Sequence, residues 1–311
     1  MKKICLVGCG SIGRLHAKNL ADKAELCFYS RTRASAEAFS CEFGGGRVFD
    51  SYEEVLDSGV DAVVISTPPE AHRIQVIDAI EAGKGVLVEK PLCATAEDLV
   101  AIGAVASAHP DMLLMVAENY YYKPALKLIK WVLQQDLIGE VRQATIGKRF
   151  TQASSGWKSG YGALLEGGVH FVAFGADLFD GELRRVSAEF PGAVAGEPER
   201  NSLVRVEYAD GAELLLRYAW NAFSLAQGTF QHSHVVGTAG QVVFESNGIY
   251  VWLKGRRKRL YFPGFGDMMG YGGMVRDFLA CLAEPGRRPY SGFSRAERDL
   301  GIVFSAYEGL A

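Results

Sequence analysis

The first part of the chain alternates short apolar runs with amphipathic stretches. The apolar runs are nearly continuous, as is typical of strands buried on both faces of a parallel sheet. They predict strands at Ile4–Val7, Glu25–Tyr29, Val60–Ser66, Val86–Val88 and Met112–Ala117. Apolar residues at helical spacing predict helices after Gly13, at Tyr52–Ser58, at Glu70–Gly83 and from Thr95 to His109. Strands and helices that alternate in this way predict a doubly wound parallel sheet.

The pattern changes near Gly139, after a predicted helix over Lys123–Gln135. Apolar and polar residues then alternate in short runs separated by turns, which is typical of antiparallel strands. These strands are predicted at Val141–Phe150, Arg184–Phe190, Ser202–Tyr208, Glu213–Ala219, Thr229–Gly237, Gln241–Glu245, Ile249–Leu253 and Arg257–Phe262, with helices near Gly273–Cys281 and Ser294–Leu310. We therefore expect two domains, one over residues 1–120 and an α+β domain with a large, mostly antiparallel open sheet over residues 121–311.

A glycine-rich turn lies between the first predicted strand and the first predicted helix. It has the spacing G-x-G-x-x-G, with Gly8 placed for the sharp turn and Gly10 for close backbone approach to a pyrophosphate. Gly13 allows the helix to pack closely on the strand. The start of the helix, at Ser11 and Ile12, offers unpaired N–H groups to phosphate oxygens. The strand, turn and helix together predict a Rossmann domain that binds a dinucleotide.

The end of the second predicted strand carries the residues that choose between NAD and NADP. An Asp or Glu is expected about 20 residues after the glycines where NAD is preferred. Ser30, Arg31 and Arg33 stand there instead, and they could hold a 2′-phosphate through charge-assisted hydrogen bonds. This favours NADP, with NAD possible; the alternative is that the two arginines only keep a loop soluble.

Polar residues follow the other predicted strands of this sheet. Ligands bind beyond the carboxyl ends of such strands, so these residues are candidates for cofactor binding. They are Thr67, Pro68, His72, Glu89, Lys90 and Asn119. Lys90 could in addition donate to a substrate oxygen and stabilise alkoxide charge during hydride transfer. The alternatives are an exposed lysine before a turn proline and, for His72 and for His16, a structural role.

Composition and charge exclude several classes of protein. The 311 residues carry a net charge of −3, which gives no basic field for nucleic acid. No apolar run approaches the roughly 18 residues that a membrane span requires. The six cysteines lack paired spacing, which favours reduced thiols in a cytoplasmic protein. A small-molecule substrate is therefore expected.

Four motifs in this order resemble the glucose-fructose oxidoreductase / inositol dehydrogenase / MocA family. They are GCGSIGRLH at 8–16, STPPEAH at 66–72, EKPL at 89–92 and AENYYYKP at 117–124, and the resemblance continues through LLEGGVH at 164–170 and VVGTAGQVVFE at 235–245. The resemblance implies a Rossmann domain, a C-terminal domain with a large open sheet, and a nicotinamide cofactor between them. It also implies a catalytic role for Lys90, a Lys90-Pro91 peptide that is often cis, and a homo-oligomer, dimer or tetramer, packed through the C-terminal sheet.

The second candidate for chemistry is the pair Glu166 and His170. Four residues apart on a helix, the carboxylate and the imidazole would share a face and could hydrogen-bond. Such a pair can move a proton, although a structural helix histidine is the alternative. The family carries Asp-x-x-x-His-x-x-Asp here, which implies that His170 is the general acid/base. Glu166 replaces the first Asp and Ala173 the last, so the substrate class stays open.

Further residues could line a sugar-sized pocket. Tyr120, Tyr122, Trp157 and Lys158 are candidates for substrate binding together with Lys90 and His170, and aromatic core filling is the alternative for the rings. His232 and His234 share a strand face, but no third ligand of fitting spacing accompanies them, so no metal is expected.

These patterns lead to one hypothesis with two rivals. The hypothesis is an NAD(P)-dependent oxidoreductase that transfers hydride between nicotinamide and a sugar, a polyol or a related cyclic alcohol or ketone. Lys90 polarises the substrate oxygen and His170, tuned by Glu166, exchanges the hydroxyl proton. The rivals are a glycosidase that uses a retained NAD by transient oxidation, and a non-catalytic nucleotide-binding regulator.

Overall fold

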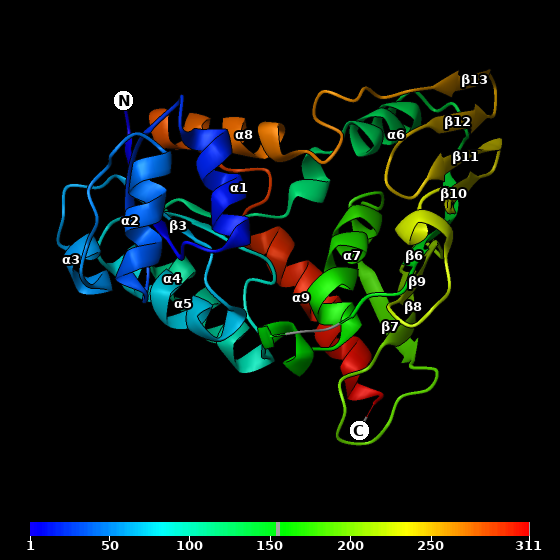
Figure 1. The fold of residues 1–311 in the computed structure, drawn as a ribbon. Helices are drawn as coiled ribbons and strands as arrows, with labels where there is room; N and C mark the ends of the chain where they lie inside the picture. The colour runs from blue at the N-terminus through cyan, green and yellow to red at the C-terminus, as the bar shows by residue number, and fades with distance from the viewer. Residues whose placement is uncertain (154–155, 311) are drawn as a thin grey trace. The chain divides into compact units, whose positions relative to one another are not determined.

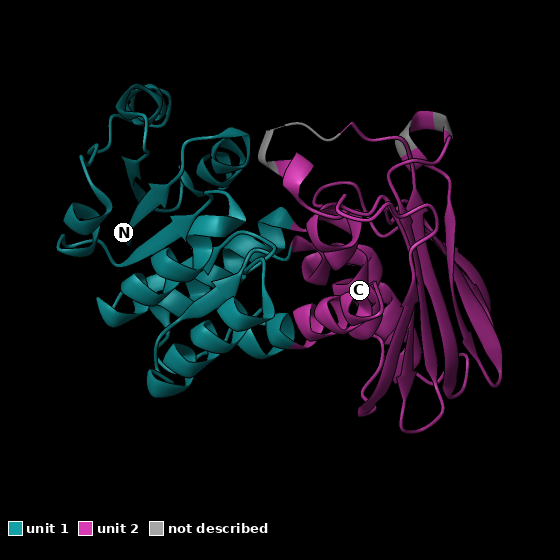
Figure 2. Ribbon diagram, turned by 90° about the horizontal axis from the view of Figure 1, so that it is seen from below, with its two compact units in different colours: residues 1–118, 271–297 teal, residues 119–270, 298–311 magenta. Residues whose placement is uncertain are grey.

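The chain divides into two compact units in the computed structural model, which describes residues 1–153 and 156–310 (Figures 1 and 2). The first unit comprises residues 1–118 and 271–297, and the second comprises residues 119–270 and 298–311. The sequence predicts one domain over residues 121–311, whereas residues 271–297 cluster with the first unit. Among the described residues, every helix is too short or too polar to cross a lipid bilayer.

The first unit is a parallel sheet with helices on both sides (Figure 1). Its strands run in the order β2-β1-β3-β4-β5, which is the doubly wound arrangement that the sequence predicts. The strands are β1 (Lys3–Val7), β2 (Glu25–Tyr29), β3 (Ala62–Ile65), β4 (Gly85–Val88) and β5 (Leu114–Val116). The helices are α1 (Ser11–Leu20), α2 (Arg33–Glu42), α3 (Tyr52–Leu56), α4 (His72–Glu81), α5 (Ala96–Ala108) and α8 (Tyr271–Ala283), with a 3-10 turn η1 (Pro69–Ala71).

Local sequence explains where several of these elements begin. Ser51 caps α3 by accepting from the Glu54 N–H at 3.1 Å, and Thr95 caps α5 in the same way. All four residues of β3 and of β4 are buried, as their continuous apolar character predicts. Helix α2 was missed in the sequence analysis, because only Ala36 and Phe39 of its ten residues are buried and its apolar stripe is correspondingly weak.

The second unit is built on a mixed sheet in the order β13-β12-β11-β10-β6-β9-β8-β7. Its pairs are antiparallel except β6 with β9, so the predicted mostly antiparallel sheet is confirmed. The strands are β6 (Val141–Arg149), β7 (Leu183–Glu189), β8 (Asn201–Tyr208), β9 (Glu213–Ala219), β10 (His232–Gly237), β11 (Gly240–Glu245), β12 (Val251–Lys254) and β13 (Lys258–Tyr261).

Helices cover one face of this second sheet. They are α6 (Pro124–Gln134), α7 (Val169–Ala176) and the later part of α9 (Phe293–Glu308). Helix α6 contacts β12, and α7 contacts β6 and β9. A 3-10 turn η2 (Asn119–Tyr122) precedes α6, 3-10 turns also occur at η3 (Gly156–Gly160) and η5 (Leu225–Gly228), and a π-helical turn η4 (Leu164–Gly168) leads into α7. In Figure 2 the described helices of this unit gather on one side of the sheet, which leaves the other face of the sheet open.

Candidate active site

The glycine turn between β1 and α1 has the geometry of a phosphate-binding turn. Gly8 has φ +100°, and a Cβ there would lie 2.9 Å from the backbone of Ser66. A Cβ on Gly13 would lie 2.3 Å from the Gly8 carbonyl oxygen, so only glycine permits this packing. A Cβ on Gly10 would meet no described atom within 4 Å, and no described side chain caps α1. The open space and the uncapped N–H groups fit a dinucleotide pyrophosphate.

The residues after β2 are accessible for contact with the adenosine end of a dinucleotide. Ser30 is half-buried and Arg31 is exposed. Arg33 pairs with Glu37 at 2.8 Å and also with Asp50. Among the described residues, no carboxylate pairs with Arg31. Of the two arginines, Arg31 is therefore the better placed to bind a phosphate.

The two turns that follow β3 and β4 are connected by His72, the first residue of α4. Its Nδ1 lies 2.9 Å from the Pro91 carbonyl oxygen and its Nε2 lies 2.9 Å from the Thr67 carbonyl oxygen. The side chain is completely buried, and this burial lowers the pKa of His72. The sequence predicts that His72 binds the cofactor, and in the structure both of its ring nitrogens face the protein backbone.

Lys90 stands two residues after β4, half-buried, and the Lys90-Pro91 peptide is cis, as the family resemblance implied. The buried carboxylate of Glu89 accepts from the Lys90 backbone N–H at 3.1 Å. Its other oxygen lies 2.7 Å from Nε2 of the buried His16, on α1. Glu89 therefore connects the glycine-turn helix to the backbone of Lys90.

Two other predicted cofactor residues also contact the protein itself. The Thr67 hydroxyl donates to the side-chain oxygen of Gln75 at 2.6 Å, while Pro68 is exposed. Asn119 is buried in the second unit, and its amide donates to the Met269 carbonyl oxygen at 2.6 Å. The side chains of Thr67 and Asn119 are thus engaged in hydrogen bonds within the protein.

In the second unit, His170 lies on the first turn of α7 and stacks on Tyr120. The ring centroids are 4.5 Å apart and the planes differ by 14°. The ammonium of the buried Lys123 lies 4.0 Å from the Tyr120 ring centroid. The structure therefore brings together two residues that the sequence analysis named separately, and it fixes the plane of the His170 ring.

The carboxylate of Glu166 is buried and forms an ion pair with Lys158 at 2.6 Å. Glu166 lies in the π-helical turn η4, which has more residues per turn than an α-helix. Side chains four residues apart, such as those of Glu166 and His170, therefore do not have the relative direction that they would have on a regular α-helix. The expected hydrogen bond between Glu166 and His170 stays a prediction. The pair of Glu166 with Lys158 was not anticipated, although both were named as site residues.

The start of the helical segment that carries Glu166 and His170 is held by a buried carboxylate that the sequence analysis missed. Glu199 accepts from the Leu164 N–H at 2.8 Å and from the Tyr307 hydroxyl at 2.6 Å. A Cβ on Gly162 would lie 2.3 Å from this carboxylate, so a larger residue there would displace the Glu199 side chain. Glu199 comes from the loop before β8 and Tyr307 from α9, and no sequence motif relates these two positions.

Burial raises the pKa of Glu199 above its ordinary value of 4.5, so the folded state binds this proton more tightly than the unfolded state. The free energy of unfolding should therefore fall as pH rises from that value through the folded pKa. Glu199→Gln should flatten this dependence, whereas Glu308→Gln, at the exposed end of α9, should not. Thermal unfolding between about pH 4 and pH 8 measures how the free energy of unfolding changes with pH. An equal pH dependence in Glu199→Gln and Glu308→Gln would contradict the prediction.

The remaining predicted side chains differ in how far they are buried and in what they contact. Tyr120 and Tyr122 are buried, which favours a packing role for at least part of each ring. The side chain of Trp157 lies outside the described residues. His232 contacts the Tyr250 hydroxyl, and within residues 1–153 and 156–310 no three His, Cys, Asp or Glu side chains are grouped so that they could hold a metal ion.

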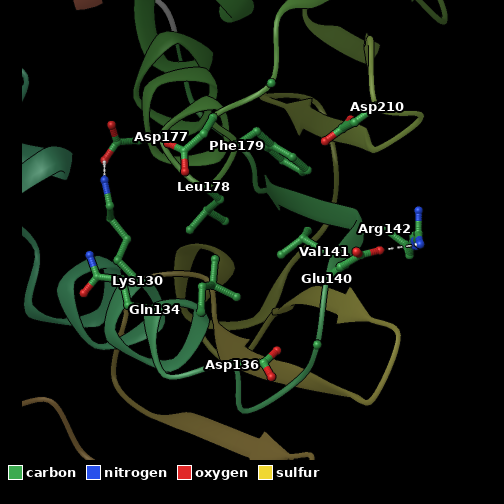
Figure 3. A pocket seen from close by; sticks show the side chains of 14 residues that line it. Lys130, Gln134, Asp136, Glu140, Val141, Arg142, Asp177, Leu178, Phe179 and Asp210 are labelled. Atoms are coloured by element: carbon green, nitrogen blue, oxygen red, sulfur yellow. Dashed lines mark hydrogen bonds and ion pairs between the residues drawn. The ribbon is translucent and has the colours of Figure 1, made fainter.

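A cavity of about 800 Å³ occurs in the second unit, away from all of these residues (Figure 3). It lies beyond the C-terminal end of α7, with Asp177, Leu178 and Phe179 on one wall and Val141 opposite. Lys130 pairs with Asp177 at 2.8 Å at its edge. None of the predicted site residues lines this cavity.

The fold and the glycine turn define a protein with a dinucleotide-binding domain, and comparison with known proteins identifies the family. Residues 2–118 match the model of the oxidoreductase family with an NAD-binding Rossmann fold, and residues 126–243 match the GFO/IDH/MocA C-terminal domain. The chain belongs to the Gfo/Idh/MocA family of oxidoreductases.

Its curated relatives include inositol dehydrogenases. The inositol 2-dehydrogenase of Acidothermus cellulolyticus is 28% identical over 256 residues, which cover 78% of this chain and 73% of that protein. The inositol 2-dehydrogenase of Rhizobium meliloti is 33% identical over 151 residues, which cover 46% of this chain and 44% of that protein. The chain thus spans less than half the length of the second relative.

Solved structures show the same fold over the whole chain. An oxidoreductase from Agrobacterium radiobacter, in complex with NAD⁺, L-tartaric acid and magnesium, has a TM-score of 0.87 at 18% identity and covers 99% of this chain and 96% of its own. A 3-ketoreductase from Actinomadura kijaniata, in complex with NADP and TDP-benzene, has a TM-score of 0.82 at 21% identity, with coverages of 99% and 97%. At these identities the likeness supports the fold.

Proposed function

We propose that this protein is an NAD(P)-dependent dehydrogenase or reductase that interconverts an alcohol and a ketone on a sugar, a polyol or a related cyclic substrate. The observation that carries the proposal is the presence, in one unit, of an open glycine turn at β1–α1 and of Lys90 just after β4. Both lie at the carboxyl end of the parallel sheet, where doubly wound folds bind their ligands. The names of the curated relatives support a polyol as substrate.

Lys90 and His170 have separate roles in this proposal. A bound nicotinamide supplies or accepts the hydride. In the oxidative direction the substrate hydroxyl loses its proton to His170 while its carbon loses hydride, so that the C–O single bond becomes C=O. The Lys90 ammonium donates to the substrate oxygen and stabilises its developing negative charge. Tyr120 orients the His170 ring through the observed stack.

The pair of Lys158 and Glu166 contributes to substrate binding in the same proposal. Lys158 is partly exposed and its ammonium is held by Glu166 at 2.6 Å, and we assign to this ammonium a hydrogen bond to a substrate hydroxyl oxygen. Assay of a panel of inositols, aldoses and cyclic polyols with NAD⁺ and with NADP⁺ tests the proposed function. Tight cofactor binding without turnover of any member would contradict it.

NADP is the cofactor that we favour, because Arg31 is exposed and follows β2, whose last residue Tyr29 accepts from the Gly8 N–H of the glycine turn at 2.9 Å. Relatives of this fold occur with either nicotinamide cofactor, so the fold itself does not choose. Arg31→Ala should weaken NADP binding about 10- to 100-fold and NAD binding much less, because only NADP carries the 2′-phosphate. Arg33→Ala is the matched control, since Arg33 already pairs with Glu37 and Asp50.

The measurement for this prediction is the dissociation constant of each reduced cofactor, followed by nicotinamide fluorescence. Equal losses of NADP and NAD affinity in Arg31→Ala would contradict the proposed contact between Arg31 and the 2′-phosphate. A larger loss of NADP affinity in Arg33→Ala would assign that contact to Arg33.

We also propose that the open face of the second sheet binds another copy of the chain. Its strands expose large apolar side chains on that face: Leu203, Val236, Trp252 and Leu260. Trp252 and Leu260 lie opposite each other on neighbouring strands, and exposed apolar side chains grouped in this way are typical of an association surface. Light scattering of the purified chain measures the mass, and a monomer at micromolar concentration would exclude the proposal.

A further inference from the structure

His72 occupies a position that neither the glycine turn nor the proposed chemistry requires. It begins α4, directly after η1, and its side chain turns back between the two loops that follow β3 and β4. None of its surface is exposed, so the imidazole cannot contact a ligand in solution directly. Its two ring nitrogens contact only backbone carbonyl oxygens among the described residues.

The chemistry of these two contacts is asymmetric. A carbonyl oxygen only accepts hydrogen bonds, and a neutral imidazole carries one N–H. Burial lowers the pKa of His72 against the opposing effect of the Thr67, Pro91 and Leu92 carbonyl groups and the Glu89 carboxylate. In the neutral ring one nitrogen donates a hydrogen bond, and the other lies 2.9 Å from an oxygen without donating. The tautomer decides which loop His72 holds.

The Pro91 carbonyl is the contact that bears on Lys90. Pro91 follows Lys90 directly, so a hydrogen bond to its oxygen restrains the chain just after the lysine. On the other side, the Glu89 carboxylate restrains the Lys90 N–H, and His16 holds that carboxylate. The backbone of Lys90 is thus restrained on both sides by buried groups.

We propose that His72 is a positioning residue for Lys90, which donates from Nδ1 to the Pro91 carbonyl oxygen and thereby directs the lysine side chain to the substrate. This inference rests on the proposed function, because it assigns His72 a role through Lys90. It differs from the cofactor-binding role that the sequence suggested for His72.

Two substitutions of His72 separate positioning from packing. In asparagine the amide nitrogen is one bond beyond Cγ, like Nδ1, and in glutamine it is two bonds beyond Cγ, like Nε2. His72→Asn can therefore keep the bond to Pro91, and His72→Gln can keep only the contact with Thr67. We expect kcat to fall about 10- to 100-fold in His72→Gln and less than about threefold in His72→Asn. Cofactor affinity should stay within about threefold in both.

If His72 only fills space, the loss of kcat should be larger in His72→Asn than in His72→Gln, because asparagine leaves the larger cavity. A greater loss of kcat in His72→Asn, or no loss in His72→Gln, would overturn the proposal. A parallel loss of cofactor affinity and kcat would also overturn it, because that result would assign His72 to cofactor binding. In the Lys90→Met background, His72→Gln should cost little further activity, since both changes remove the same function.

The tautomer of His72 in the wild-type holoenzyme supplies a test that requires neither a variant nor turnover. Long-range ¹H–¹⁵N correlation spectra distinguish a protonated Nδ1 from a protonated Nε2. Protonation at Nδ1 supports the proposal, and a proton only at Nε2 overturns it. If Lys90→Met keeps full turnover while His72 carries its proton at Nδ1, the proposed role of Lys90 fails and the hydrogen bond to Pro91 stands.

Discussion

Replacing Lys90 by methionine is expected to lower kcat by at least about 10²- to 10³-fold and to leave cofactor affinity within about threefold. The ammonium is the group that we assign to the developing oxyanion, and the loss of one such donor typically has an effect of this size. Methionine keeps most of the side-chain volume, and the backbone of residue 90 stays bonded to Glu89. Steady-state kinetics with the best substrate of the panel, together with cofactor titration, measures both quantities.

Lys18→Met is the matched control, because Lys18 is exposed on α1 in the same unit. Its kinetics should equal those of the wild type. Turnover that survives in Lys90→Met would remove Lys90 from the mechanism. A joint loss of turnover and cofactor binding would instead assign Lys90 to the cofactor, as the sequence alone also allowed.

The second large effect is expected at His170. His170→Phe should lower kcat by about 10²- to 10⁴-fold, because phenylalanine can maintain the stack on Tyr120 but cannot accept a proton. The limb of the kcat/KM profile that proton transfer to this side chain produces should disappear at the same time. The profile of log kcat/KM between about pH 5 and pH 9 is the measurement.

His109→Phe provides the control, since His109 is exposed at the end of α5. A pH limb that persists unchanged in His170→Phe would assign proton transfer to another group. Full loss of activity in both histidine variants would indicate a general effect of the substitution. That Lys90 and His170 act on the same substrate molecule stays a prediction that these two experiments test together.

Sequence periodicity was sufficient for most of the architecture. Buried parallel strands such as β3 and β4 are continuous apolar runs, and the caps at Ser51 and Thr95 are local signals. The glycine turn could be recognised because Gly8 and Gly13 are required by backbone contacts, with the adjacent strand β3 and within the turn itself, while Gly10 leaves the space in front of the helix open. Helix α2 was missed because its buried stripe consists of few residues, so its periodicity is weak.

The site was only partly predictable from the sequence. Motifs indicate Lys90, Glu166 and His170 as candidate catalytic residues. The ion pair of Glu166 with Lys158, in contrast, depends on how the chain folds between these two residues. The stack of Tyr120 on His170 joins residues 50 positions apart. No spacing rule relates such positions, because the distance between them is set by the packing of η2 against α7.

The amino-acid sequence by itself determined the family and most of the strands and helices, and it named candidate residues for the chemistry, because these depend on local patterns and short motifs. Only the tertiary structure decided what those residues contact. It placed His72 between two carbonyl groups, Glu199 at the start of the π-helical turn, and residues 271–297 with the first unit. These contacts join residues distant in sequence, and their geometry follows from packing and burial, which no local pattern encodes.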